Sequence, residues 1–148
     1  MAVNRDELIS CLNDLIQTCR DGEEGFRTAA EAVQSQALKA LFSGYSAERA
    51  QFASELQAEV QHLGGDPEKS GTVSGSFHRG WINIKSVFTT KSEPAIIAEC
   101  ERGEDTALRN YQQVLKQNLP PNVLPVVKHQ FTQIKESHDR IRDLAKAA

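Results

Sequence analysis

Four ionisable residues stand in rows of apolar residues that recur every three or four positions: Glu23, Glu48, Glu104 and His138. Such rows form the buried side of a helix, where a charge is stable only when it is paired or bound to a metal. Three carboxylates and one imidazole are suitable ligands for iron, manganese or zinc. The four residues therefore predict a metal site between helices, and Glu101, one turn before Glu104, would supply a further carboxylate.

Two long helices are predicted to carry the first two glutamates. The first helix starts at Asn4, a capping residue with Glu7 three positions later, and ends near residues 33–34. The second starts at Ser35 and stops at the run Gly64-Gly65-Asp66-Pro67, because glycine followed by proline is typical of a helix exit. These two helices form the first predicted hairpin.

Two further long helices form a second hairpin. Pro94 suits the first turn of the third long helix, and the Leu119-Pro120-Pro121 turn leads into the last one at Pro121 or Asn122. About 28 residues separate the hairpins, too many for a turn between antiparallel neighbours. We expect them to run the length of the bundle after a loop over residues 66–76. The loop is followed by one short helix, capped by Ser76 and carrying Phe77, Trp81, Ile84 and Phe88.

This topology places the four ionisable residues at a similar depth. If the connection returns to the opposite end, the four residues lie about 15–18 positions from one common end of the bundle. Their levels then agree within about one helical turn. The sequence thus predicts a single-domain, all-α four-helix bundle over residues 1–148, with one shared polar layer.

Several runs of the sequence resemble a known family. They are Asp21-Gly22-Glu23-Glu24-Gly25-Phe26-Arg27, Glu48-Arg49-Ala50-Gln51-Phe52-Ala53 with Glu55-Leu56, Phe77-His78-Arg79-Gly80-Trp81, and Glu101-Arg102-Gly103-Glu104-Asp105. Over nearly its whole length the chain resembles bacterial ferritin-like four-helix-bundle proteins that are classed as a domain of unknown function. The resemblance implies a ferritin-like bundle with a metal site in its core, and a role in iron handling or the oxidative stress response.

The ligand pattern differs from that of ferritin-like di-iron proteins. Those sites use one Glu from each of two helices and a Glu-x-x-His pair from each of the other two. Glu23 and Glu104 match the lone glutamates, whereas Gln51 stands where a His would follow Glu48, and Lys135 where a Glu would precede His138. The ligand shortage favours one metal ion over two.

A metal-free core is the alternative interpretation of the same residues. As a cation between Glu23 and Glu104, His138 would fix the helix register through a buried polar network. The protein would then be a non-catalytic helical module that acts through oligomerisation or through contacts with a partner. Whether the chain is an enzyme is left open by the sequence.

Composition excludes other classes of function. The net charge of −3 gives no electrostatic reason to expect nucleic acid, and no apolar run approaches the length of a membrane span. The first residues lack the basic and apolar regions of a secretory signal, so we expect a cytoplasmic location. No phosphate-binding loop or nucleophile elbow is present.

Two further groups of residues have structural interpretations. The three cysteines Cys11, Cys19 and Cys100 form no Cys-x-x-Cys pair, and we expect unreactive thiols in the core. His78, Arg79 and Trp81 could clamp an anion, but an aromatic anchor for the short helix, with the polar pair facing water, is favoured.

Overall fold

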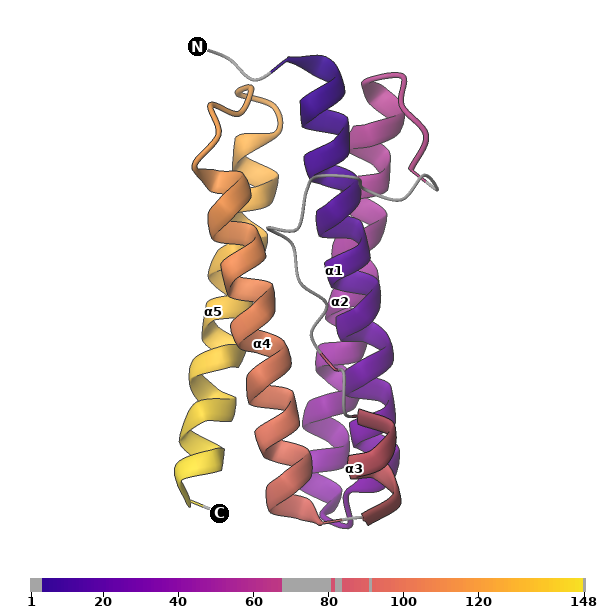
Figure 1. Ribbon diagram of the computed structural model, residues 1–148, viewed down its shortest axis with the longest axis vertical. Coiled ribbons are helices and arrows are strands. Elements are labelled where there is room, and N and C mark those ends of the chain that lie inside the picture. Colours follow the sequence, from indigo (N-terminus) through magenta and orange to yellow (C-terminus); the bar gives the residue numbers. More distant parts are fainter. Residues whose placement is uncertain (1–3, 68–80, 82–83, 91, 148) are drawn as a thin grey trace.

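The protein forms a bundle of four long helices with one short helix beside it (Figure 1). The computed structural model describes residues 4–67, 81, 84–90 and 92–147. The helices are α1 (Arg5–Ala32), α2 (Gln36–His62), α3 (Ile84–Thr90), α4 (Glu93–Leu115) and α5 (Leu124–Ala147). The predicted all-α bundle is thereby confirmed, while its specific relation to ferritins stays a prediction.

Capping residues set the helix ends where the sequence placed them. The Asn4 side chain accepts a hydrogen bond from the Glu7 backbone N–H at 2.8 Å, and Ser35 caps α2 through the N–H of Leu38. Gly64 adopts the left-handed conformation, with φ of 82°, just after α2 ends. Because an L side chain rarely adopts this φ, glycine is well suited to this exit.

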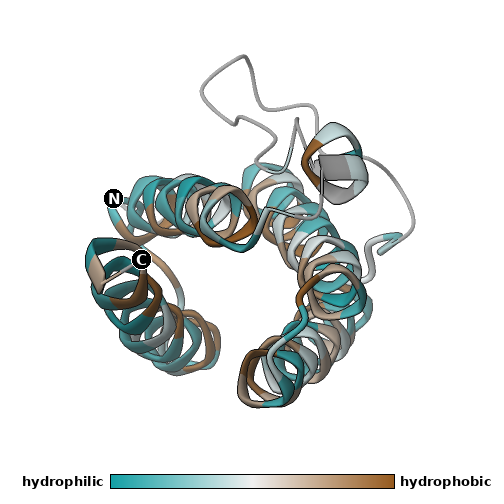
Figure 2. Ribbon diagram, turned by 90° about the horizontal axis from the view of Figure 1, so that it is seen from below, coloured by the Kyte–Doolittle hydropathy of each residue, from teal (hydrophilic) through white to brown (hydrophobic). Residues whose placement is uncertain are grey.

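Adjacent long helices run in opposite directions, and α2 and α4 run in the same direction. In Figure 1 the start of α1, the end of α2 and the α4–α5 turn lie at one end, while α3 and the start of α4 lie at the other. The connection between the hairpins therefore returns to the opposite end, as the sequence predicted. The short helix α3 packs against α1 and α4, outside the four long helices in the end view of Figure 2.

Helix packing around the bundle is uneven. The most extensive backbone contacts join α1 to α2, followed by α4 to α5 and α1 to α4, whereas α2 and α5 have the least contact among adjacent long helices. The α1–α2 hairpin is therefore held to the α4–α5 hairpin mainly along α1 and α4. Contact between α2 and α5 must come largely from long side chains.

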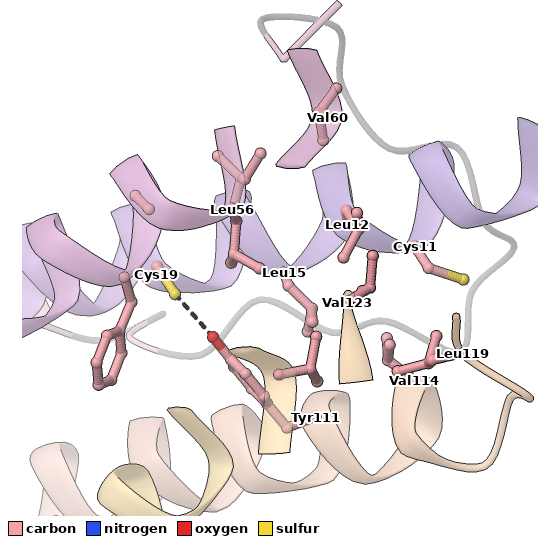
Figure 3. Packing of buried hydrophobic residues seen from close by; sticks show 14 of the residues in the cluster. Cys11, Leu12, Leu15, Cys19, Leu56, Val60, Tyr111, Val114, Leu119 and Val123 are labelled. Carbon is pink, nitrogen blue, oxygen red and sulfur yellow. Dashed lines mark hydrogen bonds between the residues drawn. The ribbon is translucent and has the colours of Figure 1, made fainter. Parts of the chain in front are cut away.

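The apolar core consists of two clusters, one toward each end of the bundle. The first cluster contains buried residues of α1, α2, α4 and α5 and the α4–α5 turn, part of which Figure 3 shows: Leu8, Cys11, Leu12, Leu15, Ile16, Cys19, Phe52, Ala53, Leu56, Val60, Ala107, Tyr111, Val114, Leu119, Val123, Val127 and Ile134. The second contains Phe26, Ala29, Ala30, Ala32, Val33, Leu38, Phe42, Ile96, Ile97, Cys100 and Ile141. Between them lies a layer of buried residues that belong to neither cluster: Gly22, Arg49, Glu104 and Ser137.

Two predicted boundaries were wrong. The short helix begins at Ile84, so Trp81 precedes it, and it ends at Thr90. Trp81 has a φ of 54°, a left-handed conformation that a continuous α-helix cannot contain. The last helix starts at Leu124, later than predicted, because residues 121–123 form a turn after the two prolines. Phe77 and the predicted cap Ser76 lie outside the described residues.

No helix in the described part of the chain combines the length and the apolar character that a membrane span requires.

Candidate functional site

Arg49 of α2 and Glu104 of α4 form an ion pair in the middle of the bundle. Each side chain is 1% exposed. The Nη1 of Arg49 donates to Oε1 of Glu104 at 2.6 Å, and Nη2 donates to Oε2 at 3.1 Å. Two parallel hydrogen bonds between a guanidinium and a carboxylate fix both side chains in one orientation. The pair thereby links two helices that are diagonal to each other in the bundle.

Ser137 of α5 completes the cluster. Its Oγ accepts a hydrogen bond from Nη2 of Arg49 at 2.7 Å and lies 2.5 Å from Oε2 of Glu104 and 2.9 Å from the carbonyl oxygen of Ile134. Because a hydroxyl has a single hydrogen, Ser137 donates to one of these two oxygens at a time. The cluster therefore joins α2, α4 and α5 at a single level.

The first helix contributes space and an aromatic face. Gly22 lies beside the Arg49 side chain, and a Cβ added there would be 3.3 Å from Cγ of Arg49. The Phe26 ring lies under the guanidinium, with 5.3 Å between Cζ of Arg49 and the ring centroid. A cation over an aromatic face is stabilised by the negative potential of the ring.

Charge pairing keeps the guanidinium ionised despite its burial. Burial alone would lower the pKa of Arg49, but the charge and hydrogen bonds of Glu104, together with the charge of Glu48, outweigh burial and raise that pKa above its usual value. Glu48 also reaches Nη2 of Arg49, at 3.4 Å, from a side chain that is 28% exposed. Partial burial raises the pKa of Glu48, and the Arg49 charge limits that rise. A single arginine thus contacts two of the predicted metal ligands.

A second polar chain crosses the first apolar cluster. The hydroxyl of Tyr111 donates to Oε1 of Gln130 at 2.6 Å and lies 3.1 Å from Sγ of Cys19 (Figure 3). The amide of Gln130 then donates to the carbonyl oxygen of Phe52 and to Oε1 of Glu55, at 3.2 and 2.9 Å. This chain connects all four long helices, and it bridges α2 and α5, the adjacent long helices with the least extensive backbone contact.

The cysteines are buried and free, as predicted. Burial raises the pKa of Cys19 to about 11 and raises the pKa of Cys11 and of Cys100 above the ordinary value of 9.0. Each is therefore a neutral thiol near pH 7, the form that is least reactive toward electrophiles.

The structure separates most of the predicted metal ligands. Glu104 is buried against Arg49, Glu48 touches the same guanidinium, and Glu23 and Glu101 are only partly buried. His138 lies toward the outside of the bundle. Its Nε2 is 2.5 Å from Oδ1 of Asp105 on α4, and its Nδ1 is 3.0 Å from Oδ1 of Asp139, the next residue.

These positions do not fit a shared metal ion. Within the described ranges, no group of three or more His, Cys, Asp and Glu side chains is arranged to hold one. The central position carries the positive charge of Arg49, and both oxygens of Glu104 are engaged by Arg49 and Ser137. A cation at this position would have to displace the guanidinium.

Three members of this layer were not predicted as site residues from the sequence: Gly22, Arg49 and Ser137. Each is the immediate neighbour of a predicted ligand, namely Glu23, Glu48 and His138. A signal was present in α5, where Val127, Gln130, Ile134, Ser137 and Ile141 are all buried with the three- and four-residue spacing of one helix face. Gln130 and Ser137 are polar, and polar residues favour an exposed assignment. For this reason the buried row was not recognised from the sequence.

Trp81 anchors the connection to the bundle, as predicted. Its indole packs against the second apolar cluster and meets the Phe26 ring edge-on, with centroids 4.8 Å apart and an interplanar angle of 70°. A Cβ added to Gly25 of α1 or to Gly103 of α4 would overlap the indole ring. Two facing glycines therefore create the slot that Trp81 occupies between α1 and α4. His78 and Arg79 lie outside the described residues.

The fold and this site define an all-α bundle with a buried arginine–glutamate pair at its centre. The chain belongs to the family described as a domain of unknown function, DUF2383, whose family model matches residues 7–117. The match runs from the first turn of α1 to just past the end of α4, and so includes both members of the pair. A search of curated proteins found no match.

Proposed function

We propose that this protein is a non-catalytic helical bundle that acts through contacts with a partner or with copies of itself, and that its central polar layer is metal-free. One observation carries this proposal: Glu104, the only predicted ligand that is fully buried, is neutralised by Arg49. Iron, manganese and zinc sites need anionic or neutral donors around the ion, whereas the centre of this bundle holds a cation.

The polar layer is well suited to fixing how the helices pair. Arg49 of α2 bonds to the carboxylate of Glu104 on α4 and to the hydroxyl of Ser137 on α5. Both contacts form in only one register of the two hairpins. A slip by one residue would leave a buried charge unpaired, which is strongly destabilising. Selection of a single helix arrangement is the best-supported role of buried polar groups in helical assemblies.

The space beside the pair also favours a role without turnover. The cavity that borders Arg49 and Glu104 leaves about 10 Å³ for the centre of a water-sized molecule. An organic substrate needs several hundred Å³, so it has no room next to these charged groups. Binding to other proteins would then use the outer faces of the helices.

Metal analysis tests the proposal directly. The full chain, purified without chelator and then incubated with Fe²⁺, Mn²⁺ or Zn²⁺, should retain far less than one ion per chain after desalting. Its melting temperature should stay unchanged, because an ion that binds only the folded state would raise it. Glu48→Ala, measured in parallel, should give the same metal content as the parent protein.

The opposite result would support metal handling, in iron metabolism or oxidative stress. That result is close to one tightly held ion per chain, with loss of the ion in Glu48→Ala or Glu104→Gln. Sedimentation velocity over a range of concentrations then addresses the second half of the proposal. Reversible self-association identifies copies of the chain as the partner, and a monomer at all concentrations directs the search to other proteins.

A further inference from the structure

The Nε–H of Arg49 is bonded to no side chain in the described part of the chain. Its Nη1 and Nη2 groups donate to Glu104, Ser137 and Glu48, while Nε is fully buried and has no hydrogen-bond partner among the residues described. Buried polar groups in folded proteins are almost always bonded to protein or to ordered water. The missing partner of Nε is therefore expected to be a solvent molecule.

A small cavity borders the Arg49 side chain. It is bordered by Arg49 and Glu104 within the bundle and by Trp81 between α1 and α4, and it leaves about 10 Å³ for the centre of a water-sized molecule. This space is sufficient for a buried water molecule.

The lining of the cavity offers acceptors as well as the donor. Thr18 and Asp21 of α1 and Asn110 of α4 line it, and each side chain carries at least one oxygen atom. Thr18 and Asn110 already bond to each other across the two helices at 3.0 Å. A buried water typically makes about three hydrogen bonds, and polar surroundings of this kind separate wet cavities from dry ones.

We propose that one ordered water molecule is bound in this cavity, accepts the Nε–H of Arg49 and donates to the oxygen atoms of the α1 and α4 side chains. The water connects the arginine of α2 to the first and third long helices. It thereby completes a layer in which all four long helices are joined to one guanidinium. This binding site goes beyond the proposed function, and it requires only that Arg49 stays paired with Glu104.

Gly22 keeps the site open. A Cβ at this position would lie 3.3 Å from Cγ and 3.7 Å from Nη1 of Arg49, on the wall of the same cavity. Gly22→Ala should therefore fill the space that the water occupies. Gly44→Ala is the matched control, because a Cβ added at that helical glycine meets no atom within 4 Å.

Two measurements on the full chain test the proposal. High-resolution crystal structures of the parent protein and Gly44→Ala should each show a water within hydrogen-bond distance of Nε of Arg49, and Gly22→Ala should show none. Oxygen-17 relaxation dispersion, which counts long-lived internal waters in solution, should give one fewer in Gly22→Ala than in the other two proteins. The proposal is overturned if the parent map has no water at Nε, or if all three proteins hold the same number of long-lived waters. The parent map is informative even if Gly22→Ala folds poorly.

Discussion

Arg49 and Glu104 meet between the two apolar clusters of the core, 55 residues apart in the chain and 2.6 Å apart at their closest atoms. Neither residue is in contact with bulk water, so each depends on the other for the stability of its charge. The apolar clusters on both sides exclude solvent from the pair, which strengthens the attraction and also raises the penalty for breaking it.

Removing one member of the pair should be more harmful than removing both. Arg49→Met leaves Glu104 buried without its counter-ion, and we expect a loss of about 3–5 kcal/mol in the free energy of unfolding. The double variant Arg49→Met/Glu104→Leu removes both charges and should recover most of this loss, because apolar packing often equals or exceeds a buried ion pair in stability. Urea unfolding of the single and double variants measures both effects. Equal destabilisation by the single and double variants would show that the charges are not coupled.

The slot for Trp81 should be intolerant of any side chain. Gly103→Ala and Gly25→Ala each place a methyl group inside the indole ring, so the tryptophan must move. We expect a loss of about 1–3 kcal/mol, as is typical of overpacking. Trp81 is the only tryptophan in the chain, so its fluorescence reports the movement as a shift to longer wavelength. Gly44→Ala, which adds a methyl group in open space, should leave the emission unchanged, and an unchanged spectrum in Gly103→Ala would contradict the slot.

The His138 contact between α4 and α5 should depend on pH. Burial by itself lowers the pKa of His138, but its hydrogen bonds to Asp139 and Asp105 outweigh burial and raise the pKa above the ordinary value of 6.5. Since the folded state favours the charged imidazole, the stabilisation is complete below the unfolded pKa and is lost as pH rises through the folded pKa.

A histidine replacement isolates this contribution. His138→Gln should destabilise the protein by about 0.2–1 kcal/mol at about pH 5.5, and the difference should shrink by about pH 8.5. His129→Gln is the control, because His129 is exposed on the same helix. A difference from the parent that stays constant over this pH range would argue against the charged contact.

Asp14 should limit stability at neutral pH. Asp14 is only 7% exposed, and its Oδ2 atom has no hydrogen-bond partner in the described part of the chain. Burial raises the pKa of Asp14 from 3.8 to about 6. Because the folded state binds this proton more tightly than the unfolded state, stability falls as pH rises from about 4 to about 6 and stays lower above that range.

Asp14→Asn removes this ionisation. After allowance for partial contact with solvent, the variant should be more stable than the parent by about 1–2 kcal/mol at about pH 7.5, and the difference should vanish near pH 4. Asp143→Asn, at a side chain that is 70% exposed, should show no comparable pH-dependent gain. Thermal unfolding from acid to neutral pH makes the comparison, and a destabilised Asp14→Asn at neutral pH would refute the prediction.

The helices and their order follow from the sequence because their signals are local. Asn4 and Ser35 bond to backbone N–H groups three residues away, and Gly64 permits the backbone conformation that ends α2. The length of the connection then required a return to the opposite end, which Figure 1 shows. The depth of the polar layer also followed from counting residues, since the rise of a helix is constant.

The identity of the residues in that layer was decided only by the tertiary structure. Cys19 and Phe26 are seven positions apart, and so are Tyr45 and Phe52, and Ile134 and Ile141. The next residue of the row after the first one in each interval can lie either three or four positions further on. Both choices keep the row on one helix face. Neighbouring residues differ in direction by about 100° around the helix axis, so the side chains at the two alternative positions face different surroundings.

In the folded bundle, the buried residue in each of the three helices is the one at the alternative spacing. It buried Gly22, Arg49 and Ser137 and left Glu23, Glu48 and His138 only partly covered. The physical reason is that burying Glu48 together with Glu104 would bring two like charges into the core, whereas Arg49 brings the opposite charge. Periodicity along one helix contains no information about the charge that another helix presents, so the sequence set the level of the site and only the assembled helices determined its chemistry.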